Sequence, residues 1–267
     1  MTLPTPDSAF HWSRETWGDA LRCEPLGQVA QHLFTTKQLQ LRPFERQREA
    51  WVEAVKAVGG AITDLKRIKQ VHGRTVYVIR PGASPFHQIP PDADAVVSGT
   101  AGHVLAVQVA DCVPVLLGDP RSGAVAAVHA GWRGSAARIS AACVETLVEE
   151  FGVRPADLIA AVGPSIGACC YEVGPELLDA FRQCGATHDQ LSRWFTRPEA
   201  GSLRLDLPAV NRDQLIEAGL QHTRIYRSGL CTQTHPTVFD SYRADGPNAG
   251  RMAALIRVPG KHQGSER

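Results

Sequence analysis

The sequence predicts an α/β fold, a single layered domain with mixed β-sheets. Apolar runs of strand length interleave with helix-like patterns along most of the 267 residues. Several neighbouring strands are joined by turns too short for a crossover helix, so antiparallel pairs must occur beside any parallel ones. A hydrophobic content of 43% suffices for a full core, and no repeat or low-complexity linker divides the chain.

Composition sets the expected domain limits. Residues 1–25 are rich in Pro, Trp and polar side chains without clear periodicity, which predicts an N-terminal extension. Residues 26–258 contain the periodic segments and form the expected domain. Residues 259–267 are expected to be a C-terminal tail.

The first predicted helix covers residues 43–59. Within it, Trp51, Val55 and Val58 recur at three- and four-residue spacing, and Gly59 follows as a stop signal. This pattern is typical of an amphipathic helix that packs one face against a core.

The next segments are predicted to be strands. Residues 68–79 alternate like a strand hairpin, and the prolines of residues 82–92 favour a loop. Further apolar strands are expected at 93–99, 104–110, 113–119 and 124–130. The turn formers in PRSG join the last two, which predicts an antiparallel hairpin.

A helix follows the sequence HAGWRG. Ser135 is the expected N-cap of a helix in which Cys143 and Leu147 face the core, and Gly152 is the expected stop. The remaining predicted elements are strand 158–163, loop 163–174, helix 175–185, strand 202–207, helix 208–220 and strand 224–229.

Charge and cysteine content exclude several classes of protein. Lys plus Arg total 28 and Asp plus Glu total 27, so the basic field that nucleic-acid binding requires is absent. Seven cysteines in this spacing favour reduced thiols over a secreted disulfide framework. The chain start lacks signal-peptide regions, and no run reaches the roughly 18 apolar residues of a membrane span. We therefore expect a cytoplasmic protein with no membrane or nucleic-acid partner; the sequence sets no oligomeric state.

Three residues with metal-ligand side chains stand at predicted strand ends. They are His72, Cys112 and His129. Two nitrogens and one sulfur leave a fourth position of tetrahedral zinc open, as in catalytic sites. The intervals match no zinc-finger spacing, so a core cysteine and two hydrogen-bonded histidines remain the alternative.

Six motifs extend this observation to a family. In order they are KQVHG, DADAVVSG, VLAVQVADCVPVLLGD, AAVHAGWRG, AVGPSIGACCYEVG and FDSYRADGPNAGRMAALI. The chain resembles the laccase-domain family, also called the multicopper polyphenol oxidase or purine nucleoside phosphorylase family, which includes peptidoglycan-editing factors. The resemblance implies that His72, Cys112 and His129 bind one zinc ion. It also implies a fold similar to that of necrotising-factor-type cysteine hydrolases.

Copper is a less favoured cofactor than zinc. A multicopper oxidase site needs paired histidines, and none of the ten histidines stands in an H-x-H pair. Of the methionines that a blue-copper site could use as axial ligand, only Met252 falls within a family motif. Laccase-type oxidase activity is therefore not expected.

The resemblance implies purine nucleoside chemistry. The expected activities are phosphorolysis of nucleosides, including methylthioadenosine, and deamination of adenosine, with purine nucleoside and phosphate as small-molecule partners. Zinc can activate a water molecule for attack on purine C6. Asp111 and Glu172 are the available proton shuttles, although Asp111 suits a structural hydrogen bond at the strand end equally well.

Arginines are the expected phosphate ligands. A guanidinium binds phosphate through two parallel hydrogen bonds, and the motif-embedded candidates are Arg133, Arg243 and Arg251. Arg133 also precedes the predicted helix, whose N-terminus favours an anion. Surface salt bridges are the alternative role for all three.

Other cysteines are expected to be structural or incidental. Cys169 and Cys170 are adjacent, which is poor geometry for a mutual disulfide and favours buried structural thiols. Cys231 and His235 look like isolated loop residues. The preceding GPSIG lacks the ending of a phosphate-binding loop and is expected to be a tight turn.

One segment departs from the family. Residues 35–50 share only FTT with the usual pattern before the first helix, which puts nucleoside specificity in doubt. Three alternatives therefore stay open: a peptidoglycan-precursor editing amidase, a metal-free amidohydrolase with Cys112 as nucleophile and His129 as base, and a non-catalytic nucleoside-binding protein.

Overall fold

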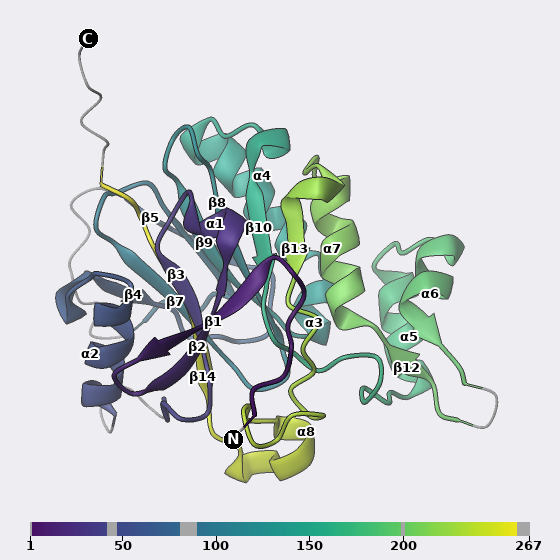
Figure 1. Cartoon of the computed structure of the whole chain (residues 1–267). Helices are drawn as coiled ribbons and strands as arrows, with labels where there is room; N and C mark the ends of the chain where they lie inside the picture. Colours follow the sequence, from purple (N-terminus) through teal and green to yellow (C-terminus); the bar gives the residue numbers. More distant parts are fainter. Residues whose placement is uncertain (1, 42–46, 81–89, 199–200, 261–267) are drawn as a thin grey trace.

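The computed structural model describes residues 2–41, 47–80, 90–198 and 201–260. Two β-sheets pack face to face, and helices cover the outer side of each sheet. Helix α2 (Arg48–Ala57) lies on one side of the pair, and helix α7 (Leu207–Glu217) lies on the other (Figure 1). The fold class predicted from the sequence, one α/β domain with mixed sheets, is confirmed.

The first sheet has six strands within the described residues. They are β1 (Phe10–Glu15), β2 (Gly18–Cys23), β3 (His32–Thr35), β14 (Met252–Arg257), β7 (Val104–Val109) and β4 (Leu65–Arg67), in this spatial order. Every pair is antiparallel except β4 with β7. Strands distant in sequence therefore become neighbours, with β14, the last strand of the described residues, between β3 and β7.

The second sheet also has six strands in the described part of the chain. They are β13 (Ile225–Arg227), β10 (Ile159–Val162), β8 (Val113–Gly118), β9 (Val125–Ala130), β6 (Ala95–Ser98) and β5 (Val76–Ile79). The outer pairs β10–β13 and β5–β6 are parallel, and the inner pairs are antiparallel. The predicted β8–β9 hairpin is confirmed.

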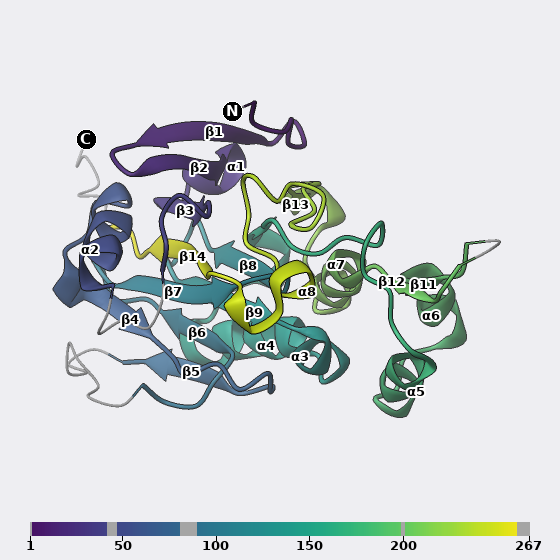
Figure 2. The same cartoon turned by 90° about the horizontal axis from the view of Figure 1, so that it is seen from below.

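The remaining elements are short, apart from α4. The helices are α1 (Glu24–Gly27), α3 (Trp132–Ala136), α4 (Ile139–Phe151), α5 (Pro175–Gln183), α6 (His188–Trp194) and α8 (Tyr242–Asp245). Short 3₁₀ turns occur at Ile62–Asp64, Pro155–Asp157, His222–Arg224 and Gly246–Asn248. Strands β11 (Phe195–Thr196) and β12 (Arg204–Leu205) form a small ribbon that projects with α5 and α6 away from the sheets (Figures 1 and 2). No helix in the described residues has the length and apolar character to cross a membrane.

Three apolar layers hold the sheets and helices together. Leu105 of β7 and Leu116 of β8 are buried between the two sheets. Ile139 and Leu147 of α4 pack on the outer face of the second sheet, and Trp51 of α2 packs on the outer face of the first. The alternating side chains of a strand explain this arrangement, because each strand contributes to the layers on both of its faces.

The N-terminal residues are not a peripheral extension over most of their length. Strands β1 and β2 pair over six residues each, and β2 continues the pairing to β3. Phe10, Leu21 and Cys23 are buried in the layer between the sheets. The expected extension is wrong for residues 10–23, because their strand partner lies outside the segment and local periodicity cannot reveal it.

Two further local predictions differ from the structure. The segment 68–79 does not form a hairpin, because β4 belongs to the first sheet and β5 to the second. Ser135 is not an N-cap, because α3 already begins after Gly131. A left-handed Arg138 (φ 66°) then separates α3 from α4, so the predicted single helix is two. Gly152 ends α4 in the left-handed conformation, as expected.

Candidate metal centre

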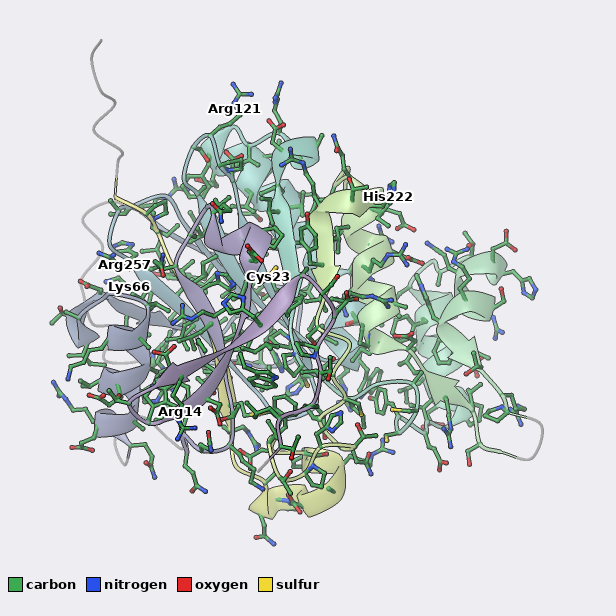
Figure 3. The ribbon with its side chains drawn as sticks, in the orientation of Figure 1. Arg14, Cys23, Lys66, Arg121, His222 and Arg257 are labelled. Atoms are coloured by element: carbon green, nitrogen blue, oxygen red, sulfur yellow. The ribbon has the colours of Figure 1, made fainter. Side chains whose placement is uncertain are left out.

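The three predicted ligands lie where the chain passes between the sheets. His72 is on the connection from β4 to β5, and Cys112 is on the connection from β7 to β8, so each joins the first sheet to the second. His129 lies in β9, opposite Pro114 of β8. The cluster is at one end of the β8–β9 hairpin, and Arg121, in the turn at its other end, is labelled at the top of Figure 3.

The structure brings the three side chains together. One ligand atom from each of His72, Cys112 and His129 lies within 4.8 Å of the other two. The Sγ atom of Cys112 is 3.8 Å from Nε2 of His72, and the two imidazole rings meet edge to face at 4.8 Å. The predicted constellation is thus assembled by the fold from three separate segments.

A glycine makes room for this approach. A Cβ atom on Gly131 would lie 2.8 Å from Cδ2 of His72 and 3.1 Å from Sγ of Cys112. Both distances are shorter than ordinary van der Waals contact, so a larger residue would push the ligands apart. Gly131 in the AGWRG motif therefore has a steric role at the cluster.

Asp94 organises the cluster and is absent from the sequence-based site. Its Oδ1 accepts hydrogen bonds from Nδ1 of His129 at 2.8 Å and from the backbone N–H of His72 at 2.9 Å. Its Oδ2 accepts a bond from the N–H of Gly73 at 2.6 Å. One buried carboxylate thus fixes both histidine segments. The sequence did offer one signal, an acidic residue directly before the apolar strand in DADAVVSG. Because fully buried carboxylates are rare without partners, such a residue indicates specific hydrogen-bond partners.

The backbone at the cluster adopts conformations that ordinary residues avoid. His72 has a φ of 60° and Asp111, next to Cys112, has a φ of 82°. Non-glycine residues with positive φ cost free energy and concentrate at functional sites, where surrounding contacts hold them. For His72 those contacts include the N–H bond to Asp94.

Electrostatics favour a thiolate at Cys112. Burial alone would raise the pKa of the thiol, but hydrogen bonds and positive charge from His129 and His72 outweigh it and lower the pKa to about 6. Burial opposes a charge on His129, whereas Asp94 and Cys112 raise the pKa of its imidazole. Without a metal, the pair therefore favours imidazolium and thiolate, and a soft cation can replace the proton.

The donor set fits zinc. A thiolate and two imidazoles are ligands that zinc prefers, and three protein ligands leave a position open for a small molecule. The bond from Nδ1 of His129 to Asp94 leaves Nε2 as the ring nitrogen for the metal, an orientation common at metal-binding histidines. His72, Cys112 and His129 would hold the ion.

Asp111 has a structural set of partners. Its carboxylate accepts hydrogen bonds from Oγ1 of Thr232 at 2.5 Å, Oγ of Ser241 at 3.1 Å and the N–H of Arg243 at 2.6 Å. These bonds connect α8 and the segment before it to the β7–β8 connection. Of the two roles considered for Asp111, this geometry favours the structural one, because its oxygens are engaged by three donors.

The three candidate arginines make no ion pair within the described residues. The guanidinium of Arg133 lies over Trp132 at 4.3 Å from the ring centre. Arg243 donates to the carbonyl of Glu172 at 2.9 Å, and Arg251 donates to the carbonyls of Ala249 and Gly250. The salt-bridge alternative therefore finds no support, since their positive charges lack carboxylate partners.

Tyr171 contacts one of these arginines and is close enough to the cluster to be affected by the charge of Cys112. Arg243 lies over the Tyr171 ring at 5.2 Å. Burial, with the nearby charge of Cys112, raises the pKa of Tyr171 to about 12, although Arg243 and Arg133 act in the opposite direction. The phenol therefore keeps its proton near neutral pH. Arg251 instead lies beside the ring of Tyr242, at 5.9 Å.

The GACCYEVG loop differs from its sequence-based interpretation. Cys169 is exposed and Cys170 half-buried, so neither is the expected buried structural thiol. Both lie near Cys231, which is consequently not an isolated loop residue. Glu172 pairs with Arg204 at 3.5 Å, and it is not one of the residues that gather at the His–Cys–His cluster.

Fold and site together define a class: layered α/β proteins with two packed mixed sheets and a His–Cys–His cluster where the chain crosses between them. Residues 45–259 match the family model described as multi-copper polyphenol oxidoreductase laccase. The chain belongs to this family, as its motifs predicted.

Individual relatives agree with this assignment. The chain is 40% identical to a purine nucleoside phosphorylase of Deinococcus radiodurans over 203 residues, 76% of this chain and 74% of the relative. It is 41% identical to adenosine deaminase RL5 of an unknown prokaryotic organism over 159 residues, 59% of each chain. The crystal structure of hypothetical protein YfiH from Bacillus licheniformis superposes with a TM-score of 0.82 at 29% identity, covering 90% of this chain and 96% of that one.

Proposed function

We propose that this protein is an enzyme, a zinc-dependent purine nucleoside phosphorylase that also deaminates adenosine. The observation that carries the proposal is the His72, Cys112 and His129 cluster, held by Asp94 and accompanied by unpaired arginines. Relatives bearing the names of both activities support it. Methylthioadenosine is included among the proposed substrates, because its reacting bond is the same purine–ribose bond.

The arginines supply the phosphate side of the proposed site. Arg243 and Arg133 both act on the Tyr171 hydroxyl, and within the described residues neither has a carboxylate partner. A phosphate bound there would receive charge-assisted hydrogen bonds from planar guanidiniums. Arg251, on the segment after α8, is the third proposed phosphate ligand.

The chain's own residues then orient the reactants. Tyr171 can donate a hydrogen bond to phosphate or ribose, because its phenol stays protonated. Phosphate aligned by Arg243 attacks C1′ of the ribose, while the purine leaves and takes up a proton. Bound zinc supplies a Lewis acid and an activated water, which suits the separate hydrolytic loss of ammonia from C6. Asp94 holds the proton on Nδ1 of His129, which leaves Nε2 for the metal.

Product analysis tests the proposal. Zinc-loaded protein should convert adenosine to adenine and ribose 1-phosphate when phosphate is present, and more slowly to inosine by water attack. Phosphate should increase adenine and leave inosine equal or lower, because the two nucleophiles attack different carbons of one bound substrate. Cleavage of a muramyl-serine amide, with neither adenine nor inosine formed, would replace the proposal by the editing amidase. Adenosine binding without turnover would indicate a binding protein.

A metal-free amidohydrolase is the second candidate, and one observation favours it. Asp94, His129 and Cys112 form a chain of carboxylate, imidazole and thiol, the arrangement of an activated cysteine nucleophile. Metal analysis separates the two candidates. Activity that survives complete removal of zinc and disappears on alkylation of Cys112 would support the amidohydrolase.

A further inference from the structure

A second group of ligand atoms lies outside the His–Cys–His cluster. The sulfurs of Cys169, Cys170 and Cys231 all lie within 4.8 Å of one another. Cys169 is exposed, Cys170 half-buried and Cys231 buried, so the group reaches from the surface into the protein. Within the described residues, no His, Asp or Glu completes this group as a fourth ligand.

Backbone pairing holds the thiols in place. Ser165 and Cys231 form an isolated parallel bridge, in which Thr232 donates to the Ser165 carbonyl at 3.0 Å. The N–H of Gly167 donates to Sγ of Cys231 at 3.3 Å. Two segments distant in sequence are therefore fixed side by side, and the sulfurs meet because of that pairing.

Two arginines lie near the cysteine group. Arg204 donates to the carbonyl of Cys169 at 2.6 Å, and its charge partly opposes the burial that raises the pKa of Cys170. Arg227 lines a pocket of about 190 Å³ whose wall also contains Cys169 and Cys231. Burial raises the pKa of Cys169 to about 12 and also raises that of Cys170, whereas hydrogen bonds, first that of the Gly167 N–H, outweigh burial and lower the pKa of Cys231. A bound cation must therefore displace protons from Cys169 and Cys170. The pocket and the exposed Cys169 give access from solvent.

We propose that Cys169, Cys170 and Cys231 form a second metal site, which binds one Cu(I) ion through three thiolates. Soft thiolates select soft cations, and Cu(I) accepts three such ligands in a plane. Structural zinc instead takes four protein ligands, and this group offers three. The site does not depend on the proposed nucleoside chemistry.

The geometry requires a small adjustment. A metal–sulfur distance of about 2.3 Å places three trigonal sulfurs about 4.0 Å apart. The sulfurs now lie within 4.8 Å of one another, slightly farther apart than in a trigonal site. A rotamer change of one exposed side chain can close this difference. Binding exchanges thiol protons for the metal, so each Cu(I) should release protons.

Titration of the full-length protein with Cu(I) tests the site. The reduced protein is first loaded with zinc, then titrated without oxygen against a coloured Cu(I) chelator. Wild type should take up one Cu(I) with a thiolate-to-copper charge-transfer band and proton release. Cys169→Ser should weaken this binding at least tenfold. Because Cys169 is exposed, the substitution should leave the protein folded, so unfolding would not explain the weaker binding. Cys231→Ser should do the same, with circular dichroism as the check of folding.

Two matched variants locate the copper. Cys184→Ser removes another exposed thiol, at the C-terminal end of α5, and should bind Cu(I) like wild type. Cys112→Ser removes the thiol of the first cluster and should also retain one Cu(I). Equal Cu(I) affinity in wild type and Cys169→Ser overturns the proposal. The proposal is also overturned if the reduced protein binds no Cu(I) and oxidation in air only forms a disulfide between Cys231 and a neighbouring cysteine.

Discussion

The Nδ1 atom of His129 lies 2.8 Å from Oδ1 of Asp94, and both side chains are buried. This contact determines which imidazole nitrogen remains for other partners. Because Asp94 also accepts from the backbone of His72, a single carboxylate sets the separation of two proposed ligands. Burial alone would raise the pKa of the Asp94 carboxyl. The hydrogen bonds from these donors outweigh burial and hold the pKa below its usual range.

The proposed ligands should determine zinc content. Metal-replete wild type is expected to contain one zinc per chain, whereas Cys112→Ser and His129→Ala lose most of it by elemental analysis. The chain should stay folded in both, because its core does not depend on the metal. Cys143→Ser is the control, since that thiol is buried in an apolar layer, where burial raises its pKa. Equal zinc in all four proteins would contradict the assignment.

Asp94→Asn should weaken zinc binding without removing a ligand. The amide keeps the size of the carboxylate but loses its charge, so His129 is no longer fixed in one tautomer. Loss of such a partner typically lowers metal affinity about 10- to 100-fold. Competition with a zinc chelator measures this, and the pH profile of zinc binding should shift because His129 becomes less basic.

Asp119→Asn is the matched control for Asp94. Asp119 is also buried and accepts from the N–H and Oγ of Ser122, but in the turn at the opposite end of the hairpin. Both variants should lose roughly 1–3 kcal/mol of unfolding free energy. Only Asp94→Asn should lose zinc affinity; an equal loss in Asp119→Asn would reduce Asp94 to a purely structural role.

Gly131→Ala tests the steric argument. The added methyl lies 2.8 Å from His72 and 3.1 Å from Cys112, so the ligands must separate. The backbone at Gly131 has a φ of −72°, which alanine adopts freely, so strain cannot account for an effect. Zinc affinity should fall while the apo protein retains nearly wild-type stability in urea. Unchanged affinity would show that the cluster expands without loss.

Local patterns predicted the elements that depend on neighbouring residues. The PRSG turn between β8 and β9 and the stop at Gly152 are examples. The β1–β2 hairpin was missed because its burial depends on β3 and β10, which other parts of the chain supply. The break at Arg138 was missed because a left-handed residue inside a helical pattern leaves no periodic signal.

The candidate site divides in the same way. His72, Cys112 and His129 carry side chains whose chemistry is visible in the sequence, and the family motifs connected them. Asp94 acts only through position, and nothing in its spacing reveals that it faces both histidines. The proximity of Cys231 to Cys169 likewise arises from pairing between distant loops.

Arg243→Lys should weaken phosphate use. Lysine keeps the charge but loses the planar fork, and a hydrogen bond to a charged group is worth roughly 1.5–3 kcal/mol, so KM for phosphate should rise about tenfold or more. Arg133→Lys and Arg251→Lys are tested beside it. Deamination without phosphate should change little, which separates a phosphate role from general damage.

Arg74→Lys is the control for the arginine series. Arg74 is exposed and pairs with Glu145 at 3.3 Å, so its substitution should leave phosphate kinetics unchanged. If Arg243→Lys and Arg251→Lys also keep the wild-type KM, these residues have no phosphate role.

His32 should make stability depend on pH. Its Nε2 accepts from the N–H of Cys23 at 2.9 Å, and its Nδ1 lies 3.0 Å from the carbonyl of Ala30, so Nδ1 carries the only ring proton. Cys23, the last residue of β2, is labelled in Figure 3. A second proton would point at an N–H donor. Burial lowers the pKa of His32 to about 4, although the Ala30 carbonyl acts in the opposite direction.

The sign of the effect follows from linkage. The unfolded histidine has a pKa of about 6.5, so between pH 6.5 and 4 the unfolded chain binds more protons than the folded one. The contribution of His32 is complete above pH 6.5 and is lost as the pH falls toward 4, by on the order of 3 kcal/mol. Urea unfolding of metal-free protein at pH 7.5 and at pH 4.5 measures this loss. His32→Gln should be less stable at pH 7.5 but lose less stability on acidification. The metal-free His–Cys–His cluster is present in both proteins, so its titration cancels in the difference. The same acid-dependent loss in both proteins would show that His32 is not the buried group that titrates.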